Sequence, residues 1–147
     1  MSDDPALAFN EEDGTAVDPI AFRDAIMADP DKRAALQAVK RTCATNLRLG
    51  GRGYFDLVRA VKSLMADSNV AIVTEAASTV TALARGLRAD FAQHARQLLG
   101  TMVDKLKEKN TGVTRALKEA LAAVSRYSLP LAEVAEDAAR GLAHKVP

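Results

Sequence analysis

Apolar residues recur every three or four positions through most of the chain, which is the period of an amphipathic α-helix. No segment alternates between apolar and polar residues with the period of two that marks a strand. We therefore predict seven helices and no β-strand. Their starts are marked in turn by Asp18-Pro19, Asp29-Pro30, the glycines at 50–53, the polar turn at 67–69, Phe91, the turn at 109–112 and Pro130.

The spacing of the turns predicts how these helices are organised. Turns between paired helices fall near Asp29, Asn69 and Thr111, about 40 residues apart, which is the repeat length of HEAT and armadillo arrays. One helix pair cannot bury its own apolar faces, so such pairs stack and share a core. We predict an all-α HEAT-repeat solenoid with three helix pairs and one extra helix.

The two ends of the chain differ from this regular middle part. Residues 1–17 contain acidic side chains and no basic one, which predicts a flexible acidic leader. Residues 18–147 form the predicted repeat domain. Because the chain stops at 144–147, where the next turn is expected, we expect a partial domain whose last helix lacks its partner.

Composition narrows the class of partner. Hydrophobic residues make up 48% of the chain, aromatic residues only 4%, and Trp is absent, so the core must consist of Ala, Leu and Val. The net charge is +1, from 20 basic and 19 acidic residues, which disfavours nucleic acid or a membrane surface as partner. Cys43 is the single cysteine, and the acidic N-terminus lacks the basic region and apolar stretch of a secretory signal. No apolar run approaches the roughly 20 residues of a membrane span, so we predict a cytoplasmic protein.

No residue pattern in the sequence indicates an enzyme. The glycines at 50–53 lack the lysine and hydroxyl of a phosphate-binding loop, so they indicate a connection between repeats. His94 and His144 are far apart and have no second ligand at metal-binding spacing, and Cys43 lies at an apolar helical position. Ser125 and Thr101 have no neighbouring base. We expect no catalytic residue, no metal and no cofactor.

Two stretches resemble a known family. They are YFDLVRAVKSLMADSNVAIVTEAASTVTALARGLRADF at 54–91 and LKEKNTGVTRALKEALAAV at 106–124. The turn D-S-N-V, the helix end G-L-R-x-x-F and the turn K-E-K-N follow one another as they do in the TOG domains of the microtubule-polymerase family, most closely the second TOG domain of the array. The final HKVP also resembles the start of that family's fourth turn.

The resemblance implies a stack of HEAT pairs whose intra-repeat turns line one narrow edge and bind αβ-tubulin. By position in the motif, it implies that the first turn is 29–32, the second is 67–70, the third is 107–112, and the fourth begins at Lys145. The residues that it implies for partner binding are Asp29, Lys32, Ser68, Asn69, Val70, Lys107, Lys109, Asn110, Thr111, Arg115 and Lys145.

The residues of two turns support this implication but have a second explanation. Five basic side chains and only one acidic side chain, Glu108, lie between residues 105 and 118, so this segment could steer an acidic partner such as tubulin or simply be a solvated helix face. Asn69 offers both a donor and an acceptor to a partner, and it could equally cap the helix that follows. The basic residues are Lys105, Lys107, Lys109, Arg115 and Lys118.

One departure from the family pattern supports a second function. The family usually has a Trp in the first turn, where this chain has Asp29, and an aromatic anchor commonly dominates an interface. The first interpretation is a tubulin-binding module of a microtubule-associated protein, in the cytoplasm on microtubules of the spindle, centrosome or cilium. The second is a HEAT-repeat scaffold for another protein. In either case we expect a monomer or a fragment of a larger multi-domain chain.

Overall fold

The computed structural model describes residues 7–10, 14–17, 19–44, 49–50 and 53–143. This part of the chain contains seven α-helices, as predicted, and a 3-10 turn, η1, at Arg88–Phe91. The helices are α1 Pro19–Ala28, α2 Lys32–Ala44, α3 Phe55–Met65, α4 Val70–Leu87, α5 Ala92–Lys105, α6 Thr111–Tyr127 and α7 Leu131–Ala143.

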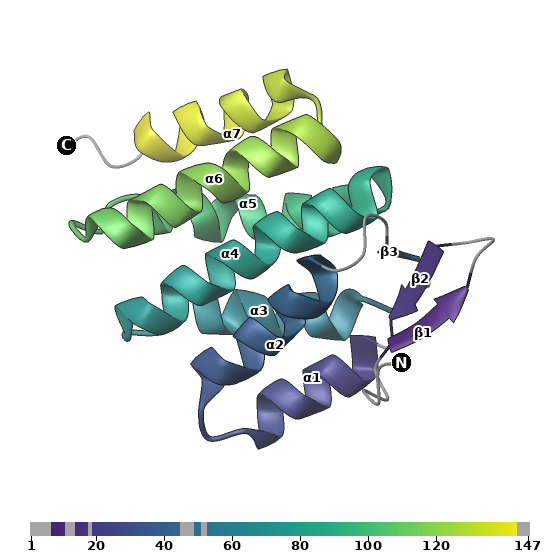
Figure 1. Ribbon diagram of the computed structural model, residues 1–147. Coiled ribbons are helices and arrows are strands. Elements are labelled where there is room, and N and C mark those ends of the chain that lie inside the picture. Colours follow the sequence, from purple (N-terminus) through teal and green to yellow (C-terminus); the bar gives the residue numbers. More distant parts are fainter. Residues whose placement is uncertain (1–6, 11–13, 18, 45–48, 51–52, 144–147) are drawn as a thin grey trace.

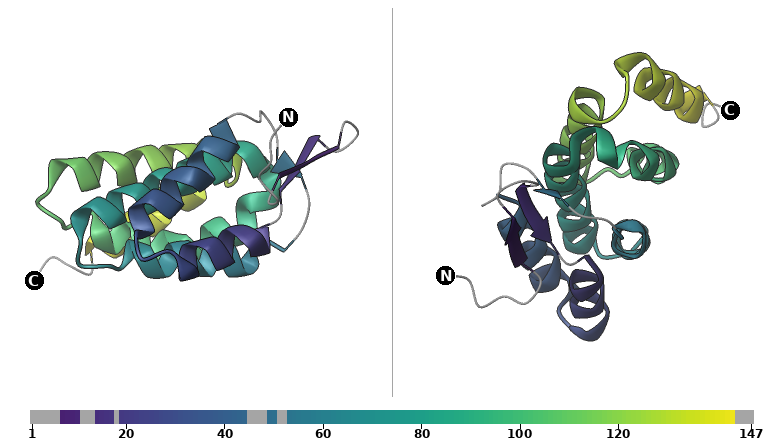
Figure 2. Two further views of the ribbon diagram at one scale, coloured as in Figure 1. Left: turned by 60° about the horizontal axis from the view of Figure 1, so that its bottom comes forward. Right: turned by 90° about the vertical axis from the view of Figure 1, so that its right-hand side faces the viewer.

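The helices form a stack of pairs in two layers (Figures 1 and 2). The pairs are α1–α2, α3–α4 and α5–α6, and α7 is the extra helix. Helices α2, α4 and α6 lie side by side in one layer, while α1, α3, α5 and α7 form the other. Because consecutive pairs contact each other within both layers, the pairs share one core, and the predicted HEAT-repeat solenoid is confirmed.

The prediction that the chain has no strand is wrong. Strands β1 (Leu7–Asn10) and β2 (Gly14–Val17) pair antiparallel, with Leu7 opposite Val17, and β3 (Leu49–Gly50) pairs parallel to β2. These strands have four, four and two residues, too short to show a period of two in the sequence. Part of the predicted leader is therefore a hairpin that pairs with the segment following α2.

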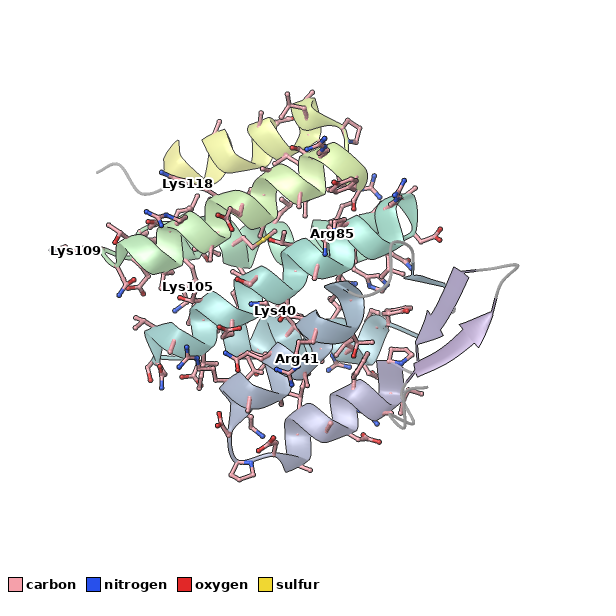
Figure 3. The ribbon with its side chains drawn as sticks, in the orientation of Figure 1. Lys40, Arg41, Arg85, Lys105, Lys109 and Lys118 are labelled. Atoms are coloured by element: carbon pink, nitrogen blue, oxygen red, sulfur yellow. The ribbon has the colours of Figure 1, made fainter. Side chains whose placement is uncertain are left out.

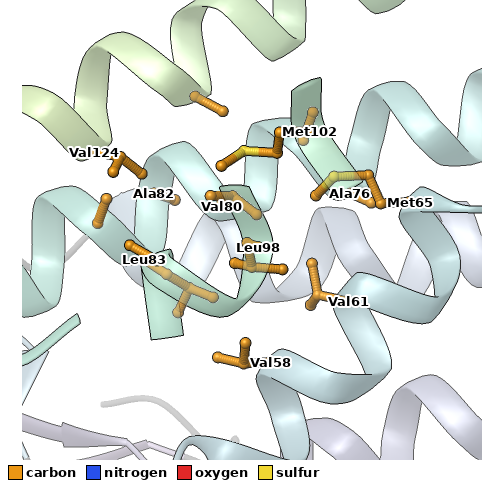
Figure 4. Packing of buried hydrophobic residues seen from close by; sticks show 14 of the residues in the cluster. Val58, Val61, Met65, Ala76, Val80, Ala82, Leu83, Leu98, Met102 and Val124 are labelled. Atoms are coloured by element: carbon orange, nitrogen blue, oxygen red, sulfur yellow. The ribbon is translucent and has the colours of Figure 1, made fainter. Parts of the chain in front are cut away.

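The core consists mostly of Ala, Leu and Val, as the composition predicts. Ala76, Ala77 and Val80 of α4 are fully buried. Figure 4 shows Ala76 and Val80 among side chains of α3, α5 and α6, and a small residue such as Ala lets neighbouring helices pack closely. Larger residues such as Met65 and Met102 fill the space between the layers. Helix α4 is enclosed by α2 and α6 within its own layer and by α3 of the other layer.

The segment that contains α4 is apolar enough to resemble a membrane-spanning helix in sequence. By length and hydropathy alone, Val70–Lys105, which joins α4, η1 and α5, is long and apolar enough to cross a bilayer, so the expectation that no segment reaches this length needs correcting. In the fold, 56% of its most apolar window is buried inside the protein. Burial in the helix stack accounts for this hydropathy.

Ion pairs join successive repeats on the surface. Arg23 of α1 lies 3.2 Å from Asp56 of α3, and Lys40 of α2 lies 3.0 Å from Glu75 of α4. Arg96 of α5 lies 2.8 Å from Glu133 of α7. An exposed pair such as Arg96–Glu133 contributes little stability, but each of the three joins two helices of the same layer.

Candidate partner-binding edge

The three turns inside the helix pairs lie along one edge of the stack, as expected. In Figure 1 the α1–α2, α3–α4 and α5–α6 turns follow the left-hand side, while the β-sheet lies on the opposite edge. Each helix pair reverses direction within a few residues, so every repeat brings its turn to the same edge. Residues far apart in the sequence thereby form one continuous row.

The first turn is capped by a different aspartate from the one that the sequence suggested. The Oδ1 atom of Asp31 accepts a hydrogen bond from the backbone N–H of Ala34 at 3.1 Å, so Asp31 caps α2. Asp29 instead accepts from the N–H of Asp31 at 2.8 Å, which closes the turn itself. The expectation that Asp29 caps the helix and Pro30 begins it is wrong, because α2 begins at Lys32.

The side chain of Lys32 is bound within its own repeat. Its ammonium donates to the carbonyl oxygens of Ile26 at 2.6 Å and Met27 at 3.0 Å, the free acceptors at the end of α1. The resemblance implied Lys32 as a partner-binding residue. Arg33 is exposed, while Lys32 is half-buried and engaged within its own repeat.

The second turn carries an exposed apolar tip on a capped helix. The side-chain oxygen of Asn69 accepts from the N–H of Ala71 at 2.9 Å, and Asp67 accepts from the N–H of Asn69 at 2.7 Å. These two bonds fix the backbone that presents Ser68 and Val70, both of which are exposed. Asn69 thus has the capping function, and its amide nitrogen makes no hydrogen bond within the described residues.

The third turn repeats this arrangement. Asn110 Oδ1 accepts from the N–H groups of Gly112 at 2.9 Å and Val113 at 3.2 Å, and its backbone is extended like that of Asn69. Thr111 is exposed beside it. The two asparagines therefore hold equivalent places in successive repeats, each fixing the start of the second helix of its pair.

The basic side chains of the third turn gather at this end of the edge. Lys107 and Lys109 are exposed, and Figure 3 shows Lys109 at the outermost point of the turn. Lys105 lies nearer the helix, with Nζ 3.8 Å from Oε1 of Glu108. Along α6 a shallow hollow of about 410 Å³ adjoins the turn, and its polar lining is Thr111, Thr114, Arg115, Lys118 and Glu119.

The edge also carries two exposed apolar residues. Val70 was expected at the interface, and Met27 was missed. Val70 is 42% exposed at the second turn, and Met27 is 68% exposed at the end of α1, next to the first turn. Met27 could have been recognised, because it falls off the stripe of Phe22 and Ile26 that α1 buries. The edge therefore combines exposed apolar groups at two turns with cations at the third.

The remaining residues that the sequence raised are Cys43, Ser125, His144 and Lys145. Cys43 is buried, and burial raises the pKa of its thiol to about 11, so it remains protonated at neutral pH. Within the described ranges, no three potential metal-ligating side chains come together. Ser125 donates its hydroxyl to the carbonyl oxygen of Ala122. Lys145 and His144 lie outside the described residues.

The chain has relatives among known proteins over most of its length. No protein-family model matches the chain. It is 30% identical to "Protein MOR1" of Oryza sativa subsp. japonica over 136 residues, 90% of this chain, and 29% identical to "Protein mini spindles" of Drosophila melanogaster over 138 residues, 80% of this chain. It spans only 7% of the length of each of these relatives.

Two solved structures share the fold. One comes from a study of microtubule plus-end tracking by XMAP215, CLIP-170 and EB1; it has a TM-score of 0.73 and 28% identity, over 84% of this chain and 52% of that chain. The other comes from work on tubulin recruitment and assembly by microtubule polymerases with Tumor Overexpressed Gene (TOG) domain arrays. It has a TM-score of 0.73 and 26% identity, over 86% of this chain and 27% of that chain.

Proposed function

Because the chain is a TOG-like HEAT-repeat domain in both sequence and fold, we propose that it binds αβ-tubulin through the edge formed by its intra-repeat turns. The observation that carries the proposal is the row of capped turns along one edge of the stack (Figure 1). The similar structure from work on tubulin recruitment supports tubulin as the partner.

The proposed interface has two kinds of contact. Val70 and Met27 would bury apolar surface, and they would replace the missing Trp of the first turn. Lys107, Lys109 and Arg115 would face acidic groups of tubulin, steering association and fixing orientation. Asn69 and Asn110 hold the turns in place, and Asp29, Ser68, Thr111 and Lys145 complete the proposed set. Lys32, bound to the end of α1, would act by holding the first turn.

The proposed activity is binding without chemistry. The domain would contribute to microtubule growth or organisation as one module of a longer chain, since linked modules raise the effective concentration of the partner. Relatives named for the spindle, the centrosome and the spindle pole body support a place on the microtubule cytoskeleton. We also propose that the domain corresponds to the second TOG domain of an array, on the strength of its D-S-N-V turn.

The test is binding to unpolymerised tubulin, measured by co-migration in size-exclusion chromatography and by fluorescence anisotropy at low and high salt. Lys107→Glu/Lys109→Glu should weaken binding about tenfold at low salt, mainly by slowing association. The control is Arg59→Glu/Arg126→Glu, which makes the same change in charge at exposed positions in α3 and in the last turn of α6.

The outcomes separate the two candidate functions. An unchanged affinity in the Lys107→Glu/Lys109→Glu variant, or an equal loss in the control, would remove the basic turn from the interface. If the folded wild-type chain does not bind tubulin even at low salt, the scaffold function takes first place. The replacement of the family's Trp by Asp29 is the observation that favours that second function.

A further inference from the structure

A second group of cations lies on the broad face formed by α2 and α4, away from the turns. It surrounds a groove of about 550 Å³, which we call the α2–α4 groove. Figure 3 shows Lys40, Arg41 and Arg85 on this face of the two helices. Its complete lining is Gln37, Lys40 and Arg41 of α2 with Ser78, Thr81, Ala82 and Arg85 of α4.

The groove is positively charged because only one of its cations is neutralised. No carboxylate belongs to its lining; Glu75, outside the lining, is 13% exposed and lies 3.0 Å from the ammonium of Lys40. Arg41 and Arg85 are exposed, and neither forms an ion pair within the described residues. The two guanidinium groups remain available to an anionic ligand.

The shape of the groove favours an extended ligand. Its lining follows Gln37, Lys40 and Arg41 along one helix, and Ser78, Thr81 and Arg85 along the facing helix. The stretch from Ser78 to Arg85 spans about 10 Å at the rise of an α-helix. A single small anion would contact only part of this length, whereas several consecutive acidic side chains would reach along both rows.

We propose that the α2–α4 groove binds a carboxylate-rich peptide segment of a partner protein. Guanidinium groups bind carboxylates through paired hydrogen bonds, which Arg41 and Arg85 supply from opposite helices. The hydroxyl of Ser78 and the amide of Gln37, which already donates one N–H to Glu75 Oε1 at 3.4 Å, offer further donors between them. The site is separate from the tubulin-binding edge, because its residues come from the middle and final turns of α2 and α4 and none from an intra-repeat turn.

The test uses a fluorescein-labelled decaglutamate peptide and anisotropy at low salt, with a Gly-Ser peptide of equal length for comparison. The wild-type chain should bind decaglutamate and not the Gly-Ser peptide. Arg41→Gln/Arg85→Gln should weaken binding about tenfold, since both bidentate contacts are lost. The matched control, Arg59→Gln/Arg126→Gln, removes two exposed arginines outside the groove and should change affinity by less than about twofold.

Three results would overturn the proposal. Equal losses in both double variants would mean that the peptide responds only to net charge. Loss of binding in Lys107→Glu/Lys109→Glu but not in Arg41→Gln/Arg85→Gln would place the peptide at the turn edge. Tighter binding by Asp3→Asn/Asp4→Asn would assign the groove to the chain's own acidic N-terminal segment. Retained decaglutamate binding in a variant that has lost tubulin would support the groove independently of the edge.

Discussion

At the scale of single residues, the turns rely on Asx side chains that hydrogen-bond backbone N–H groups nearby in sequence. Asp31, Asn69 and Asn110 each cap the second helix of a pair. Capping by Asn69 was one of the two explanations that the sequence left open, and Asn110 holds the equivalent position in the next repeat. The first turn contains two aspartates around Pro30, and the sequence does not distinguish the cap from the turn residue, since both can make local bonds of similar strength.

The caps lead to a stability prediction. Asp31→Ala should lower the free energy of unfolding by about 1 kcal/mol, because it leaves an N–H group of α2 without its acceptor. Asp29→Ala should cost about half as much, because its bond closes an exposed turn. Urea denaturation of both variants measures the difference. A larger loss at Asp29 than at Asp31 would contradict the observed assignment.

His94 is a buried titratable residue of α5. It is 6% exposed, its ring lies 5.8 Å from that of Phe91 and 6.4 Å from that of Phe55, and its Nδ1 atom has no partner within the described residues. Burial lowers its pKa, because desolvation penalises the charged imidazolium. The folded protein therefore favours neutral His94.

This lowered pKa predicts that stability depends on pH in a defined direction. As pH falls through about 6.5, the unfolded chain takes up a proton on His94 before the folded chain does, so the free energy of unfolding decreases. His94→Phe should reduce this decrease, because the buried ring no longer titrates. Urea denaturation at about pH 7.5 and about pH 5.5 measures both slopes. An unchanged slope in a folded His94→Phe variant would show that other groups cause the dependence.

At the scale of elements, the layers depend on how each helix ends as well as on which face it buries. Helix α4 ends at Leu87, and its C-cap residue, Arg88, has φ 55° and ψ −122° and begins η1, which turns the chain into α5. Residues with side chains rarely adopt this conformation, since Cβ crowds the backbone. The sequence marks the place with the motif from Gly86 to Phe91, but the strained residue is Arg88, and the glycine two positions earlier is buried within α4.

Relieving this strain should stabilise the junction. Arg88→Gly is expected to raise the free energy of unfolding by about 1 kcal/mol, because glycine adopts positive φ without the Cβ penalty. The matched control is Lys118→Gly, at an exposed helical position in α6, which should lower it by about 1 kcal/mol. Thermal and urea denaturation distinguish these opposite signs. A loss of stability in both variants would mean that Arg88 makes compensating contacts.

At the scale of the whole molecule, the stack turns local features into two separate surfaces. The turns of successive repeats form the edge, and the outer faces of α2 and α4 form the groove. Neither surface exists in a single repeat, because each takes residues from helices that contact only through stacking. The edge is proposed to combine apolar and charged contacts, and these two kinds of contact should respond differently to salt.

The apolar part of the edge can be tested at Val70. Val70→Ser should weaken tubulin binding about fivefold, mainly through faster dissociation, and the loss should persist at high salt because apolar burial is not screened. Leu131→Ser is the control, since Leu131 is 68% exposed at the corresponding first position of α7, away from the intra-repeat turns. Anisotropy at two salt concentrations measures both variants. A loss at Val70 that disappears at high salt would contradict an apolar contact.

The sequence by itself determined the helices and the three turns of this protein, and it offered Asn69 as a cap. These features depend on interactions within about four residues, such as helical hydrogen bonds, Asx caps and the apolar stripe of each helix. The spacing of the turns then indicated stacked pairs, because a pair of amphipathic helices needs neighbours to bury its apolar faces.

Only the tertiary structure decided which residues from different repeats meet. The pairing of Lys40 with Glu75, the convergence of Arg41 and Arg85 on one groove, and the pairing of β2 with β3 join segments more than thirty residues apart. The exposure of Met27 and Val70 at one edge also follows from the stack. Such contacts depend on the relative positions of whole helices, which the packing of many small side chains fixes together and which no local pattern of residues records.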